Sequence, residues 1–220
     1  MSAPTAGRIR LSDPSELIAA VPHLLGFHPH DSVVVLTLHG KNLGLTLRAD
    51  LVPPDRAPQL AEQLLRPITR AQPSAIVLVV IGGDSNVDDD IPHRALVAAF
   101  AHALDGAGLP VVLAAWTTEI KRGAPWRCYD DFLCAGTVAD PATSPLAAAT
   151  VAAGAVTFGS RQEMADLLAT HDPEALQRRA ALLDAADAEH PMSDRLVKQR
   201  FVQLRQLHKA ASRGEVVLTD

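Results

Sequence analysis

The pattern of hydrophobic and polar positions changes its period within the first fifty residues. From Asp13 to Gly26, apolar residues recur every three or four positions, between a capping aspartate and a glycine suited to a left-handed stop. Residues 32–38 form a continuous β-branched run, and residues 43–51 alternate between apolar and polar side chains. We therefore expect a helix that ends at Gly26, followed by a β-hairpin whose turn lies at residues 39–42.

The next segments alternate between helical and strand patterns. The expected order is a helix at 55–68, a strand at 75–81, a helix at 91–105, a strand at 109–116 and a short strand at 126–129. The two longer strands are apolar throughout, so both should be central, parallel and joined in a βαβ unit. The fold class that this order predicts is α/β: a mixed sheet with an N-terminal β-hairpin and a βαβ unit, with helices packed on it.

Helical patterns fill the remainder of the chain. They begin near residues 144, 160, 172 and 194, and Leu218–Asp220 could begin another. We expect a flexible tail at 1–10, an α/β sheet region at 11–143, and a helical extension at 144–220 that packs on the same domain and is truncated at its end. Helices left exposed by truncation would favour a homo-oligomer or a protein partner.

Composition narrows the classes of function. The 220 residues carry a net charge of −5 and only 4% aromatic residues, which argues against general nucleic-acid binding. A basic stripe on the predicted helix at 194–213 leaves a nucleic-acid or acidic partner open. No apolar run is long enough to cross a bilayer, and no signal sequence precedes the domain, so we expect a cytoplasmic protein without membrane contact.

The loop after the strand at 75–81 has the features of a ligand site. Gly82, Gly83, Asp84 and Ser85 follow the carboxyl end of a central strand and precede a helix, where α/β sheets bind ligands. The glycines allow a close backbone approach, but their spacing matches neither a P-loop nor a dinucleotide fingerprint. The alternative is a solvated acidic turn whose last aspartate caps the helix.

Other site candidates lie on the neighbouring strands. Glu119 follows the strand at 109–116 and is, with Asp84, a candidate catalytic carboxylate. Arg48 and Asp50 share one strand face and could hold a ligand or form a surface ion pair. Trp126 lies in a short segment rich in aromatic and charged residues, which is typical of pockets and also of a plugged sheet edge.

Histidines and cysteines give no recognised metal spacing. His23, His28 and His30 are close in sequence but fall on a helix and a turn, so we expect no metal there. Cys128 and Cys134 are expected to be ordinary thiols, with a disulfide as the alternative. The sequence does not identify a cofactor, and the carboxylates of Asp84, Asp88, Asp89 and Asp90 could help to hold a hard cation such as Mg²⁺.

Several segments together resemble a known bacterial family. PHLLGFHPHDSVVVL, LTLRADL, PWRCYDDFLCAG and SPLAAATVAAGAVTFGSRQEM are similar to the domain-of-unknown-function 4192 family, over residues 11–164. The most specific segments are Pro22 to Pro29, Arg48 to Leu51, and Ser160-Arg161. Relatives tend to have a paired cysteine where this chain has Cys134-Ala135-Gly136, and they are typically longer. The resemblance implies no reaction.

Two hypotheses of function follow. The first is a non-enzymatic binding or regulatory module that self-associates, favoured because no nucleophile–base pair, metal triad or phosphate loop is visible. The second is a metal-dependent hydrolase or transferase, with Asp84, Asp88 and Glu119 at the carboxyl end of the sheet and Arg48 holding an anionic group.

Overall fold

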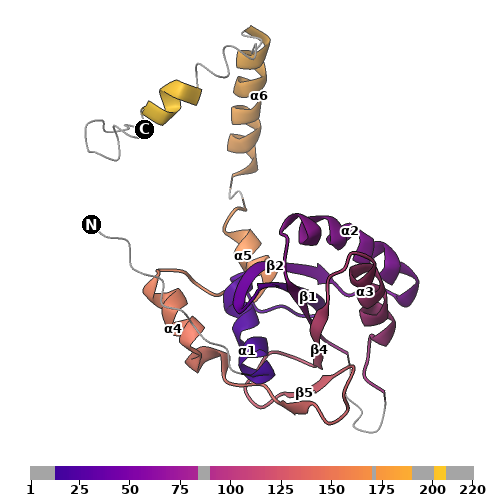
Figure 1. Cartoon of the computed structure of the whole chain (residues 1–220). Helices are drawn as coiled ribbons and strands as arrows, with labels where there is room; N and C mark the ends of the chain where they lie inside the picture. Colours follow the sequence, from indigo (N-terminus) through magenta and orange to yellow (C-terminus); the bar gives the residue numbers. More distant parts are fainter. Residues whose placement is uncertain (1–12, 84–89, 170–171, 190–200, 207–220) are drawn as a thin grey trace. The chain divides into compact units, whose positions relative to one another are not determined.

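The computed structural model describes residues 13–83, 90–169, 172–189 and 201–206. It divides the chain into two compact units, Met1–Leu167 and Leu168–Asp220. The first unit contains a mixed sheet covered by helices on both faces (Figure 1). The α/β class, the N-terminal hairpin and the helices packed on the sheet are confirmed. Of the helix predicted at 194–213, only residues 201–206 are described, and Leu218–Asp220 lies outside the described residues.

Helix α1, Pro14–Leu25, begins and ends where the sequence signals it. The Asp13 carboxylate accepts a 3.0 Å hydrogen bond from the Glu16 amide, and Pro14 occupies the first turn. Gly26 stops the helix at φ 80°, and its amide donates to the Pro22 carbonyl. Pro22 lies inside the helix, which continues for one turn beyond it.

The sheet has the strand order β2-β1-β3-β4-β5-β6. Its strands are β1 (Ser32–His39), β2 (Asn42–Asp50), β3 (Ala75–Ile81), β4 (Val111–Thr117), β5 (Pro125–Cys128) and β6 (Ala135–Thr137). The β3–β4 pair is parallel, and the other neighbouring strands are antiparallel. The predicted parallel pair is therefore at the centre, with the hairpin joined to β3 through β1.

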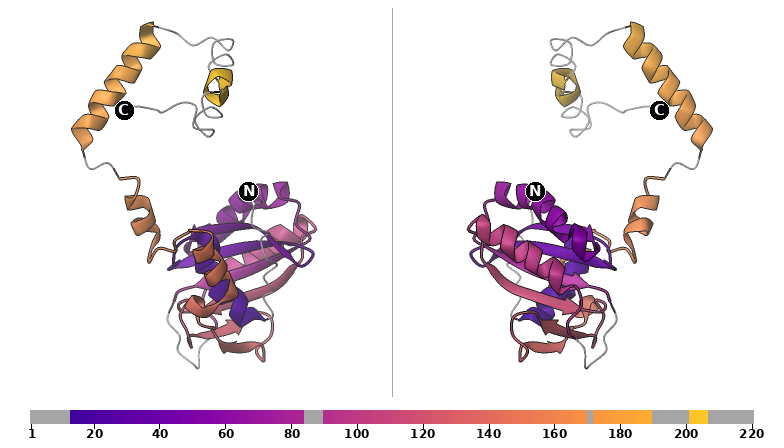
Figure 2. Two further views of the ribbon diagram at one scale, coloured as in Figure 1. Left: turned by 90° about the vertical axis from the view of Figure 1, so that its left-hand side faces the viewer. Right: turned by 90° about the vertical axis from the view of Figure 1, so that its right-hand side faces the viewer.

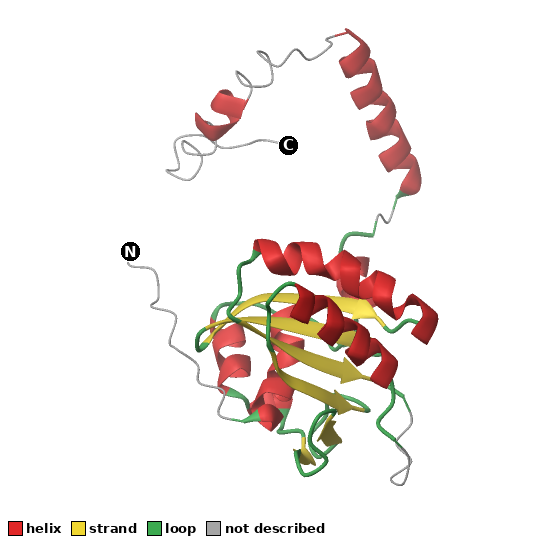
Figure 3. Cartoon of the chain, turned by 45° about the vertical axis from the view of Figure 1, so that its right-hand side comes forward, coloured by secondary structure: helices red, strands yellow, loops and turns green. Residues whose placement is uncertain are grey.

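Two hydrophobic cores lie on opposite faces of this sheet. The first core lies beneath helices α2, Ala57–Arg70, and α3, Arg94–Gly106, which run side by side on one face (Figure 3). Its largest fully buried side chains include Phe100 and Trp116. The second core lies beneath α1, with Ile18, Leu36 and Ile81 fully buried.

The C-terminal part of the first unit packs against α1. It comprises the short 3-10 turn η2 (Pro141–Thr143), α4 (Pro145–Ala152) and α5 (Arg161–Asp166). Helix α4 and η2 both contact α1, as the views in Figure 2 show for α4. Ser144 and Ser160 cap α4 and α5 by accepting hydrogen bonds from the Ala147 and Glu163 amides, as the sequence predicts.

Strand β2 departs from the simple alternation expected of it. Leu47 and Ala49 pack on the first core as predicted, but Leu43 packs on the second. The pairing register shifts between Leu36 and Leu38, which moves the tip of the hairpin to the other face of the sheet. The prediction that Leu43 and Leu47 share a face is therefore wrong.

Helix α3 begins at Arg94, not near Ile91 as the sequence suggests. His93 adopts a left-handed conformation at φ 60° and offers no capping hydrogen bond. Asp90 caps nothing in α3; instead its carboxylate pairs with the Arg94 guanidinium and accepts a 2.9 Å bond from the Ile91 amide. The Arg94 hydrogen bond lowers the pKa of Asp90.

The β5–β6 hairpin carries the two cysteines. Cys128 and Cys134 form a disulfide, with their Cα atoms 5.4 Å apart, so the expectation of ordinary thiols is wrong in this structure. Phe132 and Leu133 occupy the intervening loop and are 82% and 78% exposed.

The second unit is helical. Its long helix α6, Pro173–Glu189, begins at the predicted Asp172-Pro173 signal, and residues 201–206 form another helical stretch. Leu176, Leu182 and Leu183 on α6 are exposed. Within the described ranges, no helix is long and apolar enough to cross a membrane.

Candidate functional site

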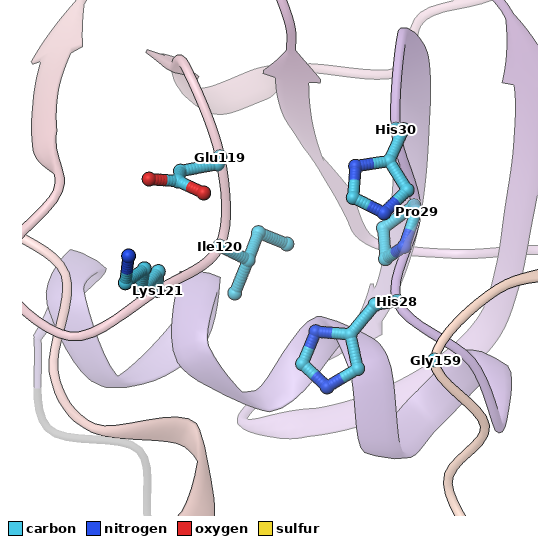
Figure 4. A pocket seen from close by; sticks show the side chains of 7 residues that line it. All are labelled: His28, Pro29, His30, Glu119, Ile120, Lys121 and Gly159. Atoms are coloured by element: carbon cyan, nitrogen blue, oxygen red, sulfur yellow. The ribbon is translucent and has the colours of Figure 1, made fainter.

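A pocket of about 270 Å³ opens at the sheet edge where β1 begins and β4 ends. It is lined by His28, Pro29, His30, Glu119, Ile120, Lys121 and Gly159. These residues come from three loops: the α1–β1 connection, the loop after β4, and the turn before α5. Figure 4 shows both imidazoles facing the loop that carries Ile120. The Glu119 carboxylate is turned away from them in this view.

One side of the pocket is formed by His28, Pro29 and His30, which we call the histidine wall. Backbone pairing between distant segments holds this wall in place. Phe27 and Phe158 form an isolated parallel bridge. The His28 amide donates to the Phe158 carbonyl at 2.9 Å, and the Phe158 amide donates to the Gly26 carbonyl at 2.8 Å. Pro29 is buried between the two histidines. The α1–β1 connection and the turn containing Gly159 are therefore fixed to each other by backbone hydrogen bonds.

The opposite side of the pocket is the loop after β4, and the backbone of this loop is held in place by hydrogen bonds and by burial of Ile120. The buried Thr117 hydroxyl lies 2.9 Å from both the Glu119 and the Pro125 carbonyls, to either of which it can donate. Ile120 is 6% exposed and packs in the second core, whereas Glu119 and Lys121 are exposed. The loop thus presents a carboxylate and an ammonium from a fixed backbone.

Arg48 holds the backbone of the histidine wall through hydrogen bonds. Its Nε donates to the Ser32 hydroxyl at 2.7 Å and its Nη2 donates to the His30 carbonyl at 3.2 Å. The Ser32 hydroxyl in turn donates to the same carbonyl. Arg48 also pairs with Asp50 at 2.6 Å, with side-chain exposures of 15% and 77%. Arg48 thus bonds to its own chain, and the surface ion pair foreseen for these two residues is present.

Burial and neighbouring charge shape the protonation of the histidine wall. Burial lowers the pKa of His28, and the nearby His23 and His30 lower it further. His28 is therefore mainly neutral near pH 7. His23 itself is held by two partners, with Nε2 2.8 Å from the Pro141 carbonyl and Nδ1 2.9 Å from the Thr157 hydroxyl.

Gly82 and Gly83 lie at the same edge of the sheet but do not line the pocket. The Gly82 amide donates to the Thr117 carbonyl at 3.0 Å, and its carbonyl accepts from Trp116 Nε1 at 2.7 Å. Asp31 crowds Gly82 so closely that a Cβ there would lie 2.5 Å from its Oδ1. His93 lies against Gly83, and its buried Nε2 has no hydrogen-bond partner within the described residues.

The remaining site predictions have different outcomes. Glu119 lines the pocket, and its catalytic role stays a prediction. Trp126 does not line it, because its ring is buried in the second core against Gly136. Asp84, Ser85 and Asp88 lie outside the described residues, so the loop hypothesis also stays a prediction. No group of three or more potential ligands capable of holding a metal ion occurs in the part of the chain that the structure describes.

Sequence reasoning missed the composition of the pocket. His28 and His30 were considered only as metal ligands, and neither Lys121 nor Gly159 was singled out. The available signal was the resemblance itself, because Pro29 ends one of its specific segments and Gly159 precedes another, Ser160-Arg161. Pro29 and Gly159 are 130 positions apart in the sequence and line the same pocket.

Comparison with known proteins gives one match. The family model described as "Domain of unknown function (DUF4192)" matches residues 14–220. No curated protein and no solved structure matches the chain.

Proposed function

Because the chain belongs to the DUF4192 family, whose description assigns no activity, we propose a function from the site alone: a non-enzymatic module that binds a small polar molecule in the pocket between His28, His30 and Lys121. One observation carries this proposal. Of the segments through which the chain resembles its family, the first contributes Pro29 to the pocket, the second contributes Arg48, which donates to the carbonyl of the lining residue His30, and the third, Ser160-Arg161, directly follows the lining residue Gly159.

The dimensions and lining of the pocket support a small ligand. Its volume of about 270 Å³ lies just below the range of roughly 300–1,000 Å³ that is usual for drug-sized ligands. Pro29 and Ile120 supply apolar surface, while two imidazoles, an ammonium and a carboxylate supply polar groups. Such a mixture orients a polar metabolite by hydrogen bonds.

Binding rather than catalysis is the simpler function for this arrangement. Glu119 is exposed and turned away from His28 and His30 in Figure 4, so those side chains do not form a nucleophile–base pair. Arg48, which could hold an anion, instead donates to the backbone at His30. These features suit a rigid wall against which a ligand is held.

Native mass spectrometry of the tag-free chain tests the proposal. We expect a co-purified small molecule, retained after chelator treatment, whose occupancy falls in Lys121→Ala. Arg122→Ala is the matched control, because Arg122 is the next residue, is also exposed and does not line the pocket. Equal occupancy in both variants, or no ligand mass in any preparation or in a metabolite screen, would refute a binding function at this pocket.

We propose self-association as a second property, with another copy of the chain as the partner. All three leucines of α6 are exposed, by 55% at Leu176, 70% at Leu182 and 67% at Leu183. Because helices in proteins owe most of their stability to packing, covering these exposed leucines would stabilise α6. Light scattering should report an oligomer that Leu182→Glu disrupts and Gln177→Glu leaves intact; a monomer at all concentrations would contradict this.

A further inference from the structure

Positive and protonatable groups outnumber acidic ones in the lining of the pocket, although the chain as a whole is acidic. The net charge of the chain is −5, yet the pocket is lined by one ammonium, two imidazoles and one carboxylate. The carboxylate, on Glu119, is turned away from the imidazoles (Figure 4). Lys121 and the two imidazoles, which are donors or potential donors, therefore outnumber the single carboxylate among the polar groups that line the pocket.

The backbone of the histidine wall is fixed, so its imidazoles are presented as a pair. His28 and His30 flank the buried Pro29, whose ring restricts the backbone between them. His28 is tied to Phe158 by its amide, and His30 is tied to Arg48 by its carbonyl. Neither imidazole has a hydrogen bond to another described residue in this structure, so both rings remain available to a ligand.

From this placement we infer that the ligand is an oxyanion, and that it binds together with a proton taken up by the His28–Pro29–His30 wall. Lys121 contributes an ammonium to the lining of the pocket, and an anion bound beside the imidazoles favours their protonated form. This inference rests on the proposed function, because it names the class of ligand that the same pocket takes.

The charged surroundings favour proton uptake on binding. Burial and the neighbouring His23 and His30 keep the pKa of His28 low in the empty pocket, so His28 is mainly unprotonated near neutral pH before the ligand binds. Among the described residues, the charged groups around the wall include Asp31, which follows His30 in the sequence, Lys121 and Glu119 on the opposite loop, Arg48 on β2, and Glu163 on α5. Arg48 is neutralised by Asp50, and Glu163 accepts a 2.7 Å bond from the Gly159 amide.

By linkage, an anion that raises the imidazole pKa binds more tightly as the pH falls. For each proton taken up, affinity weakens by up to about tenfold per pH unit above the pKa of the free site. Competing neutral ligands, such as sugars, gain nothing from imidazole protonation. The pH dependence of binding therefore distinguishes an oxyanion from a neutral polar ligand.

Isothermal titration calorimetry with sodium sulfate and sodium acetate tests the inference, because neither probe titrates between about pH 6 and pH 8. Sulfate represents tetrahedral oxyanions and acetate represents carboxylates, and glucose serves as a neutral probe. Repeating each titration in buffers of different ionisation enthalpy counts the protons taken up. We expect about one proton per bound oxyanion, and an affinity at least about tenfold higher at the lower pH.

Variants of the lining residues test whether the proton is taken up by the histidine wall. In His28→Gln combined with His30→Gln, binding of the oxyanion should persist weakly with no proton uptake, whereas His39→Gln, an exposed histidine in the hairpin, should behave like the unchanged protein. Lys121→Ala should weaken binding at every pH without abolishing proton uptake. The proton count on the unchanged protein needs no variant, so a folding defect in the double variant does not affect it.

Two results would overturn the inference. Oxyanion binding without proton uptake in the unchanged protein refutes the proton-coupled site, and pocket-dependent binding of glucose alone refutes the ligand class. In the second case, binding that is sensitive to Lys121→Ala would leave the proposed function standing. If neither anions nor neutral probes nor co-purified molecules depend on the pocket residues, the proposed function itself fails.

Discussion

Gly26 lies directly against Met164, so that a Cβ at Gly26 would be 2.9 Å from the Met164 Cε. The contact joins the end of α1 to α5, two elements far apart in the sequence. It lies beside the Phe27–Phe158 bridge that positions His28. The left-handed stop of α1 and the histidine wall therefore depend on the same local packing.

Gly26→Ala should destabilise the protein by about 1–2 kcal/mol, because alanine is strained at φ 80° and its methyl group displaces the Met164 side chain. Urea unfolding measures the change. Gly40→Ala is the control: Gly40 has φ 61° but nothing within 4 Å of an added Cβ, so it carries the backbone strain alone. Equal losses in both variants would mean that the Met164 contact contributes nothing.

His23→Ala should loosen the segment that packs on α1. The variant removes two hydrogen bonds, to the Pro141 carbonyl and the Thr157 hydroxyl, and leaves their partners part-buried. We expect a loss of about 1–3 kcal/mol, together with faster amide exchange in residues 141–159. His102→Ala, at an exposed position of α3, should change neither quantity. Unaltered exchange in that segment would show that His23 does not hold it.

Arg48→Lys should weaken both stability and pocket binding. Lysine keeps the charge and can still pair with Asp50, but one ammonium cannot reproduce the forked bonds to Ser32 and His30. The expected loss is about 1–2 kcal/mol in urea unfolding. Arg70→Lys at the exposed end of α2 is the control. A ligand affinity unchanged by Arg48→Lys would show that the position of His30 does not depend on this fork.

Acid should destabilise the empty protein through His28 and His93. Burial lowers the pKa of both histidines below the ordinary value of 6.5, so the unfolded chain takes up protons first as the pH falls. Their contribution to stability is present above about pH 6.5 and is lost as the pH falls toward their folded-state pKa values. Urea unfolding from neutral to mildly acidic pH should show this decline.

Single variants separate the two histidines. His28→Gln and His93→Asn should each flatten the decline, whereas the exposed His102→Gln should not. Because the Asp31 carboxylate raises the pKa of His93 against the effect of burial, Asp31→Asn should lower that pKa further. Titration of the His93 imidazole by NMR measures this shift. A rise in the pKa on removal of the carboxylate would contradict the assigned coupling.

Local signals were enough to predict the first helix and the central strands. Asp13, Pro14 and Gly26 act within α1 itself, and the apolar run of β3 needs no distant partner to be recognised. The predicted start of α3, near Ile91, was wrong because Asp90 pairs with Arg94 and His93 takes a left-handed conformation. Neither preference can be read from hydrophobic periodicity.

Features that depend on distant pairing could not be predicted in this way. Strand β6 is three exposed residues that become a strand only through pairing with β5. The face of Leu43 depends on a register shift opposite Leu36 and Leu38. The pocket was missed for the same reason: Glu119 was identified from its position after a strand, but its neighbours His28 and Gly159 reach it only through tertiary packing.

Strands β1 and β3 each contribute side chains to both cores. In β1, Val33 and Val35 pack in the first core, and Val34 and Leu36 pack in the second. Detaching either helical layer would leave every other residue of these strands facing water. Neither layer can melt alone, so the region up to Leu167 should unfold in a single cooperative transition, with the amides of β1 and β3 the last to exchange.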